Sequence, residues 1–332
     1  MRRALPLLLF LLCAPILALA NLVNTNCYLG VTPPFGDGSS ASAPLDASTA
    51  AKLDAIYAAR CWQGSDHPST SITFIYAPGT YQTRGWDFQQ RETMLSGNYH
   101  VGAGRGQTII QLVGAYQLTA DGTVFAADGH WTSYWGVSNL TIDCNAQKNL
   151  KFTSGLGAVA AIGAAGADNC TVSNVEVINF GTGHVTVECF PISFFANSIA
   201  GTMTNIYVEN CLFDHPATGN KDGCSVVAMN DAPQNGVTMG IYCIVQNCSF
   251  ENCKSDFLYC HCAEAPWVLN NYAINSGVFF YTEPLAPQWS TTTIEVTGNH
   301  VINADTFFNS IPHPGGSLAC PIGIGLNTIE TR

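Results

Sequence analysis

Two aspartates with a lysine close before each are the residues of this sequence best suited to chemistry. Asp222 follows Lys221 directly, and Asp256 comes two residues after Lys254. Each aspartate begins a short run of alternating residues. If the two runs are neighbouring strands, about 4.8 Å apart, one carboxyl pKa rises and the pair can serve as general acid and base on a glycosidic bond.

Other polar side chains surround this pair in the expected geometry. Period-two alternation turns Tyr259 and His261 outward beside Asp256, and it turns Glu188, with His184 close by, outward one turn of chain earlier. We expect these four residues and the two lysines to contact a sugar. Each candidate residue also has a structural explanation that needs no sugar. Asp often begins a strand, and single acids and histidines are common on surfaces.

No metal-ligand spacing accompanies these residues. The cysteines at 243, 248, 253, 260 and 262 contain no CxxC pair, so we expect no structural zinc. A calcium ion becomes relevant only if the reaction is a lyase reaction on a charged sugar, where Ca²⁺ can bridge carboxylates.

A repeat indicates the elements that hold these positions. Five segments share a valine followed two residues later by an asparagine, before further alternation; they begin at Val137, Val172, Val208, Val245 and Val268. The segment from Val296 repeats this order with Gly298 in place of asparagine. Fixed short strands with loops of variable length are typical of a parallel β-helix.

The asparagines of the repeat are expected to stack at one bend of each coil. They are Asn139, Asn174, Asn210, Asn247 and Asn270. An asparagine side chain can bond to the next one along such a stack and tolerates bend geometry. Cys211 and Cys248 then occupy equivalent positions, either as a disulfide or as an inward stack of thiols.

Each coil is expected to contain a second strand, near residues 183–189, 222–228, 256–262, 277–283 and 305–310. Before the coils, a helix is expected over about residues 46–60, with Asp46 as its N-cap and Ser48 and Thr49 as alternatives. It would cap the open end of the solenoid. A strand from Ile72 reaches a Pro-Gly turn, and a glycine-rich bend leads to a strand at 108–112.

These features together resemble the pectate-lyase superfamily, and more narrowly its rhamnogalacturonase/epimerase-like branch of secreted proteins. The resemblance rests on the helix, the turn at residues 77–81, the strand after Gly104 and the asparagine coils, and it covers roughly residues 30 to 310. It implies an all-β, single-stranded right-handed parallel β-helix with coils over about residues 70–310. Relatives of this kind are polysaccharide lyases, glycoside hydrolases, sugar epimerases or phage tailspikes.

One segment is also similar to a motif of the polygalacturonase family of glycoside hydrolases. Residues 220–223 read Asn-Lys-Asp-Gly, where that family has Asn-Thr-Asp-Gly. The rest departs from the family, because Ser255-Asp256 stands in place of paired aspartates and residues 276–278 lack the family's histidine. Membership of that family is therefore in doubt.

The first twenty residues have the form of a secretory signal peptide. Arg2 and Arg3 precede an apolar run, and Ala18-Leu19-Ala20 is a typical cleavage site, which leaves residues 21–332 as the β-helix domain. We expect a secreted protein, extracellular or periplasmic, without a membrane span. Removal of the signal peptide takes Cys13 away and leaves thirteen of the fourteen cysteines. Because thirteen is odd, not all of them can pair within the chain.

Charge limits the partners. The 12 Lys and Arg against 23 Asp and Glu give a net charge of −11, which argues against nucleic acid and favours a neutral or sparsely charged glycan. We expect no required cofactor, and either a monomer or an oligomer joined through an uncapped C-terminal end.

The sequence thus favours a secreted glycoside hydrolase with Asp222 and Asp256 as its catalytic pair. Two alternatives stay open. One is a lyase or epimerase that uses Ca²⁺, and the other is a β-helix without catalysis that binds glycans or serves as a surface adhesin.

Overall fold

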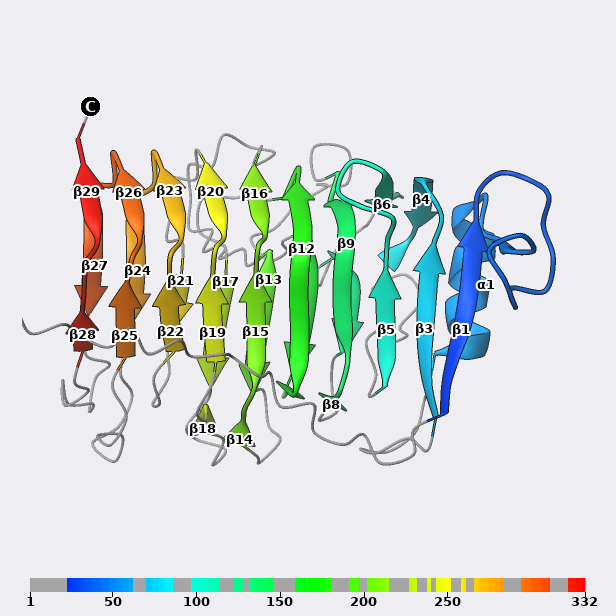
Figure 1. The fold of residues 1–332 in the computed structure, drawn as a ribbon, viewed down its shortest axis with the longest axis horizontal. Helices are drawn as coiled ribbons and strands as arrows, with labels where there is room; N and C mark the ends of the chain where they lie inside the picture. The colour runs from blue at the N-terminus through cyan, green and yellow to red at the C-terminus, as the bar shows by residue number, and fades with distance from the viewer. Residues whose placement is uncertain are drawn as a thin grey trace, which may run out of the picture.

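The structure is a computed structural model that describes most of the chain in separate stretches. These are residues 23–61, 70–85, 97–113, 122–127, 132–145, 159–165, 167–180, 191–196, 202–214, 227–231, 238–239, 243–251, 258–260, 266–282, 294–310 and 322–331. Within them the chain winds as a parallel β-helix, as the repeat predicted (Figure 1).

Eighteen of the described strands form one long sheet, called here the bent sheet because many of its coils change direction at an asparagine. The strands are β1 (Val23–Gly30), β2 (Leu45–Asp46), β3 (Thr70–Tyr76), β4 (Gly79–Thr83), β5 (Asn98–Val101), β6 (Thr108–Leu112), β9 (Gly136–Asp143), β12 (Cys170–Ile178), β15 (Ile206–Glu209), β16 (Leu212–Asp214), β19 (Cys243–Gln246), β20 (Ser249–Glu251), β22 (Pro266–Leu269), β23 (Tyr272–Ile274), β25 (Ile294–Thr297), β26 (His300–Ile302), β28 (Ile322–Ile324) and β29 (Thr328–Glu330).

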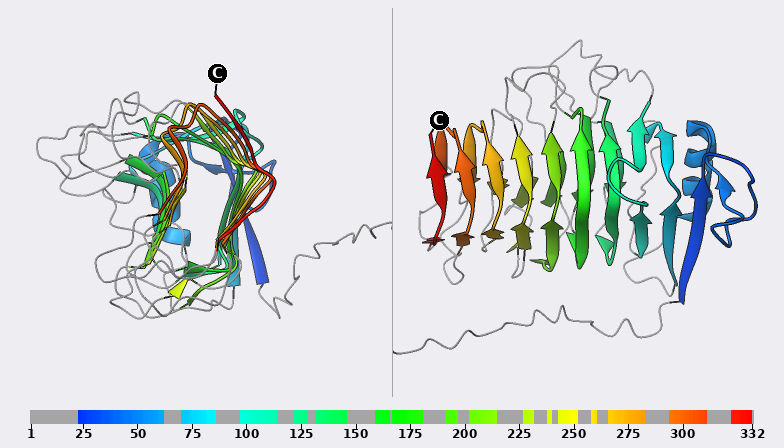
Figure 2. Two further views of the ribbon diagram at one scale, coloured as in Figure 1. Left: turned by 90° about the vertical axis from the view of Figure 1, so that its left-hand side faces the viewer. Right: turned by 45° about the horizontal axis from the view of Figure 1, so that its top comes forward.

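A seven-stranded sheet lies opposite the bent sheet, as the view along the axis shows (Figure 2). Its strands are β7 (Gly122–Ala127), β10 (Val159–Ala165), β13 (Ile192–Ala196), β17 (Val227–Asp231), β21 (Leu258–Cys260), β24 (Val278–Thr282) and β27 (Thr306–Ser310). Two short pairs complete the described strands: β8 (Thr132–Ser133) with β11 (Ala167–Asp168), and β14 (Thr202–Met203) with β18 (Thr238–Met239).

The predicted asparagine stack is confirmed. Asn139, Asn174, Asn210, Asn247 and Asn270 all have φ between 52° and 56°, a left-handed conformation that asparagine tolerates better than most residues. The Nδ2 of Asn174 donates to Oδ1 of Asn139 at 2.8 Å, one coil away. Asn210, Asn247 and Asn270 bond to the next coil through their backbone N–H groups. Each asparagine therefore turns its own strand at the bend.

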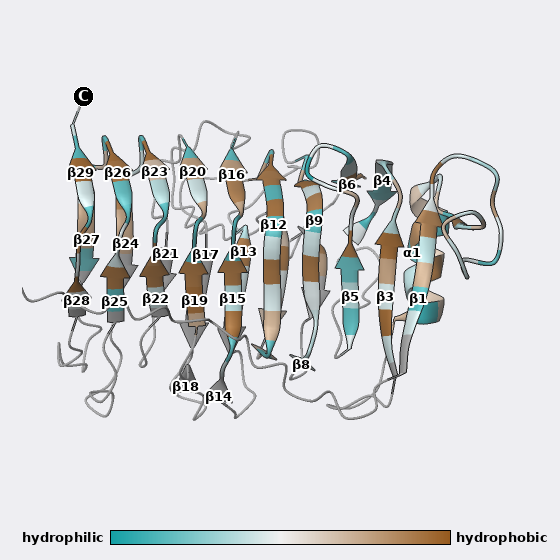
Figure 3. Ribbon diagram, viewed as in Figure 1, coloured by the Kyte–Doolittle hydropathy of each residue, from teal (hydrophilic) through white to brown (hydrophobic). Residues whose placement is uncertain are grey.

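Inward-facing side chains form columns along the axis, because neighbouring coils pair in the same register. Figure 3 shows the resulting apolar bands at matching levels of neighbouring strands. Cys211 and Cys248 lie in one such column as free, buried thiols, so the thiol stack is found rather than the disulfide.

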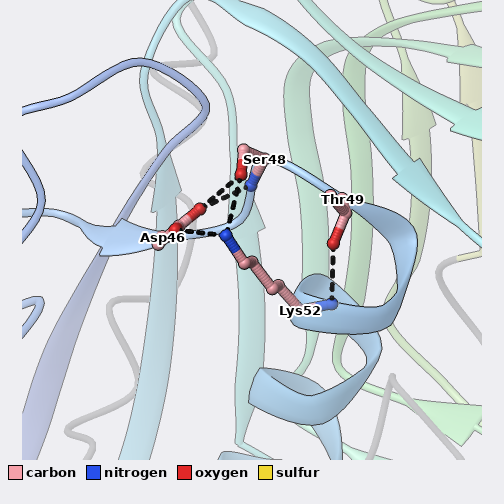
Figure 4. Close-up of polar contacts among 4 residues, drawn as sticks. All are labelled: Asp46, Ser48, Thr49 and Lys52. Carbon is pink, nitrogen blue, oxygen red and sulfur yellow. Dashed lines mark hydrogen bonds and ion pairs between the residues drawn. The ribbon is translucent and has the colours of Figure 1, made fainter.

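The helix α1 (Ala50–Arg60) starts later than predicted, and the expectation of Asp46 as its N-cap is wrong. Thr49 is the N-cap, with its hydroxyl accepting from the N–H of Lys52 (Figure 4). The Asp46 carboxylate instead accepts from Ser48 and from the Lys52 ammonium, which lower its pKa to about 2. Leu53 and Tyr57 are buried, so α1 packs on the first coils; its role as a cap stays a prediction.

The turn at residues 77–78 joins β3 to β4, and the glycine-rich bend leads to β6, as predicted. In the stretches that the structure describes, no helix is long and apolar enough to cross a membrane.

Candidate functional site

The seven-stranded sheet contains the described strands that lie nearest to the predicted site residues. Three of the five predicted second strands contain β21, β24 and β27, whereas β17 shares only residues 227 and 228 with the strand predicted at 222–228. These four strands pair in parallel as neighbours. For the coil before them, the described strand is β13, while the predicted strand at 183–189 lies outside the described residues.

Of the eight predicted site residues, Tyr259 is the one within the described stretches. It lies on β21, in register between Ala228 of β17 and Tyr281 of β24. The other seven lie outside the described residues, namely Asp222, Asp256, Lys221, Lys254, His184, Glu188 and His261. Their roles therefore stay predictions.

The register of β17 and β21 bears on the expected aspartate pair. Val227 pairs with Leu258. A pairing that placed Asp222 opposite Asp256 would instead put Val227 opposite His261. Strand register alone therefore does not align the two aspartates, and any approach depends on the segments that precede the strands.

Aromatic side chains support the end of this sheet. Phe279 stacks on Phe307 with ring centroids 5.3 Å apart, and Phe280 meets Phe308 at 5.5 Å. Phe279 and Phe280 are fully buried although they are consecutive, so both faces of β24 are covered at this level. Asp305, just before β27, is exposed.

Polar side chains on the outer face of the bent sheet form contacts from coil to coil. Gln111 donates to Asp143 at 2.7 Å, and the Thr141 hydroxyl donates to Glu176 at 2.6 Å. Gln246 donates to Glu209 at 3.0 Å. These contacts place carboxylates on a face where strands lie about 4.8 Å apart, and each carboxylate has a neutral donor beside it.

On this face, within the described stretches, His300 contacts a carboxylate. Its Nε2 lies 2.9 Å from Oε1 of Glu330 on β29, and its ring meets the Tyr272 ring edge-on at 5.5 Å. An imidazole held by a carboxylate can transfer a proton, and a neighbouring phenol can pack on a sugar ring. These three residues, called here the His300 cluster, were not predicted from the sequence.

A signal for the His300 cluster is present in the repeat. Tyr272 comes two residues after the bend asparagine Asn270, and His300 comes two residues after Gly298, which takes the same place. In earlier coils that position holds Glu176 and Ser249. Aligning the repeats by their bends, rather than by their strands, would have placed both residues in one outward column.

The buried cysteines are not suited to catalysis. Burial raises the pKa of the Cys144, Cys170 and Cys248 thiols well above the ordinary value, so they are protonated near neutral pH. Among the described residues, no three His, Cys, Asp or Glu side chains are grouped to hold a metal ion. The described stretches therefore contain no such side-chain group for the Ca²⁺ ion that a lyase could use.

Comparison with known proteins gives two kinds of similarity. No family model matches the chain. The chain is 36% identical over 107 residues to alginate lyase 7 of Azotobacter vinelandii and 34% identical over 147 residues to the mannuronan C5-epimerase AlgE5 of the same organism. These alignments cover 31% and 43% of the chain, but 12% and 13% of the two relatives.

Among solved structures, the chain is similar to PfbA, a surface adhesin of Streptococcus pneumoniae. The TM-score is 0.50 at 15% identity, over 92% of this chain and 80% of that one. This likeness supports the fold alone.

The relatives bear on the alternatives that the sequence left open. They are named for lyase and epimerase chemistry on polysaccharides, whereas the sequence placed a glycoside hydrolase first. The hydrolase prediction therefore finds no support, and the lyase or epimerase alternative fits better.

Proposed function

We propose that this protein modifies a polyuronate of the alginate type, as a lyase or a C5-epimerase. The observation that carries the proposal is the identity of 33 to 36% that the chain shares with an alginate lyase and several mannuronan C5-epimerases. The parallel β-helix is a scaffold on which such chemistry is possible, but a fold alone does not select a reaction.

The two candidate reactions share their first step. A base removes the proton from C5 of the uronate, next to its carboxylate. In the lyase the electron pair forms the C4–C5 double bond and the C4–O bond breaks, so the leaving oxygen takes a proton. In the epimerase a proton returns to C5 from the opposite face. Both need one acid, one base and a partner for the carboxylate.

The predicted residues can be assigned to these tasks. Asp222 and Asp256 are proposed to move protons, and Lys221 and Lys254 to neutralise the uronate carboxylate or serve as base. Tyr259, His261, His184 and Glu188 are proposed to contact the sugar.

A solenoid suits a polymeric substrate. Neighbouring coils lie about 4.8 Å apart, so a glycan along the axis meets equivalent positions in coil after coil.

We further propose that the protein belongs to the pectate-lyase-like β-helix proteins. We also propose that residues 1–20 direct its export, since alginate is a polymer found outside the cell.

The test is incubation of the purified protein with polymannuronate, polyguluronate and a neutral polysaccharide. A lyase gives unsaturated products with ultraviolet absorbance, and an epimerase gives deuterium at C5 when the reaction runs in D₂O. New reducing ends without unsaturation would instead restore the hydrolase prediction. Binding without turnover on every polymer would replace the proposal by a glycan-binding module.

The residue assignment has its own test. We expect Asp222→Asn and Asp256→Asn each to lower kcat by about a hundredfold or more, as is usual for general acid–base groups. Asp305→Asn is the matched control, because Asp305 also precedes a strand of the same sheet and is exposed. Activity at the control's level in both variants would remove the two aspartates from the mechanism, and loss of activity with EDTA would identify a Ca²⁺ requirement.

A further inference from the structure

The outer face of the bent sheet has a column of large apolar side chains in the middle of the solenoid. Strand pairing in register places Tyr207 of β15, Ile244 of β19 and Trp267 of β22 side by side. The valine that follows each of them is buried in the core, so alternation along the strand turns these three side chains outward. We call these three residues the aromatic stripe.

The rings provide most of the surface that the aromatic stripe presents to solvent. Ile244 lies between the two aromatic residues and is only 7% exposed, although it is on the outer face. Tyr207 and Trp267 are half-buried. A ligand that approaches the stripe therefore meets two rings with an aliphatic side chain between them.

An earlier residue of the same column shows how a ring lies on this face. Tyr99 of β5 pairs with Gly136 of β9, three coils before Tyr207. A Cβ added to Gly136 would lie 3.2 Å from Cδ1 of the Tyr99 ring. The ring therefore lies along the sheet, over the neighbouring coil, and does not stand away from it. In this orientation an aromatic side chain turns one face toward solvent.

The spacing of the two rings of the stripe matches an extended glycan. Tyr207 and Trp267 are two coils apart, which is about 9.6 Å along the axis. In an extended β-1,4-linked polymer each sugar advances by nearly the spacing of one coil and is turned over relative to its neighbour. Alternate sugars therefore present the same apolar C–H face, and two rings at this separation can each pack on one of them.

Polar side chains beside the stripe can accept hydrogen bonds from sugar hydroxyls. Glu209 and Gln246 come two residues after Tyr207 and Ile244 on the same strands, and they hydrogen-bond to each other at 3.0 Å. Glu295 is exposed and pairs in register with Trp267. The stripe thus has hydroxyl acceptors along its side and at its end.

The charge of this region selects against an anionic polymer. From residue 202 onward, the described residues include no lysine or arginine, and the basic side chain of the bent sheet there is a histidine, His300. The carboxylates on its strands from β15 to β29 are Glu209, Asp214, Glu251, Glu295 and Glu330. A polyuronate is repelled by such a surface, whereas a neutral glycan is not.

We propose that the aromatic stripe binds a neutral β-1,4-linked glycan that runs along the axis of the solenoid. The bent sheet lies opposite the seven-stranded sheet, so this site is on the other side of the solenoid from the strands nearest to the predicted site residues (Figure 2). The protein can then hold a neutral polymer on one side while it acts on a charged polymer on the other.

The test measures binding of the full chain to soluble glucomannan, a neutral β-1,4-linked polymer, by calorimetry and by electrophoresis in gels that contain the polymer. We expect a Kd for glucomannan that changes little with salt, because no charge pairs form. Trp267→Ala and Tyr207→Ala should each weaken binding by about tenfold or more, as loss of an aromatic anchor does. Trp267→Phe keeps a ring and should retain most of the affinity.

The matched control is Tyr28→Ala on β1, which removes a half-buried tyrosine from the outer face of the same sheet near α1. We expect this variant to bind glucomannan as the unchanged protein does, and circular dichroism checks the fold of every variant. No binding of glucomannan, or equal binding by Trp267→Ala and the control, would overturn the proposal.

Polymannuronate has the same linkage as a β-1,4-mannan but carries a carboxylate on each sugar. We expect Trp267→Ala to bind it as the unchanged protein does. A tenfold loss here as well would overturn the assignment of the stripe to a neutral polymer. Glucomannan binding is measured without turnover, so its result does not depend on the proposed enzymatic activity.

Discussion

Gly298 occupies the bend position that holds asparagine in five earlier coils. Its φ is +73°, close to the asparagine values, but a Cβ at this position would overlap the side-chain oxygen of Asn270. In that coil the Asn270 amide fills the space that the next side chain would take. The break in the repeat is therefore a packing requirement between two neighbouring coils.

We expect Gly298→Ala to lower the free energy of unfolding by about 3 kcal/mol or more, because backbone strain and overlap act together. Gly106→Ala is the matched control. Its φ is +70° and no atom lies within 4 Å of the added Cβ, so it should cost only about 1–2 kcal/mol, from the backbone. Urea unfolding measures both variants.

Gly298→Asn separates the two causes further. Asparagine tolerates the left-handed backbone, and Asn270 can then return to the stacking seen between Asn174 and Asn139. We expect a smaller loss than for alanine. If Gly298→Ala loses no more stability than the control Gly106→Ala, the overlap with Asn270 is relieved at no cost.

At the scale of elements, the attachment of α1 depends on a buried chain of hydrogen bonds. The Tyr57 hydroxyl lies 2.6 Å from that of Tyr76, which lies 2.7 Å from Nδ1 of His100. All three side chains are at most 1% exposed. A second link joins Asp54 of α1 to Thr83 at 2.9 Å and to Arg84. Polar groups inside the core thus fix the helix to β3, β4 and β5.

This network predicts a loss of stability at alkaline pH. Burial raises the pKa of Tyr57 and of Tyr76 well above 10. The protonated phenols therefore stabilise the fold fully below pH ~10, and this contribution falls above it, where tyrosines of the unfolded chain lose their protons. We expect the free energy of unfolding to decrease steadily from pH ~10 upwards.

Tyr76→Phe tests the assignment. It removes the hydrogen bonds that Tyr76 makes with Tyr57 and with His100 and should cost about 1–3 kcal/mol at neutral pH, but its alkaline loss should be smaller than that of the unchanged protein. Urea unfolding at several pH values measures both slopes. Equal alkaline slopes in the two proteins would mean that other groups cause the loss.

The elements also show what could be read from the sequence. The asparagine bends were predictable because one residue type recurs where each coil needs a left-handed backbone. The N-cap was not, because Asp46, Ser48 and Thr49 are all good caps and the Lys52 ammonium draws Asp46 away. The register between β17 and β21 was also not predictable, because it depends on a loop whose length changes from coil to coil.

For the whole molecule, the net charge has the same sign as the charge of the proposed substrate. The protein has a net charge of −11, and a polyuronate has one negative charge on each sugar. On charge alone, a neutral glycan was the better expectation, whereas the proposed substrate is a polyuronate of the alginate type. The two are compatible if repulsion acts at long range while Lys221 and Lys254 attract the carboxylates locally.

Changing the ionic strength separates the long-range repulsion from the local attraction by the two lysines. At ~10 mM salt the Debye length is about 30 Å, so the substrate senses most of the protein, and at ~150 mM it is about 8 Å, so local groups dominate. We therefore expect KM for polymannuronate to fall several-fold between these concentrations, at constant kcat and constant Ca²⁺. A short uronate oligomer, which carries fewer charges, should show a smaller change. If KM rises with salt instead, a strongly basic cleft outweighs the net charge of the molecule, and repulsion does not limit binding.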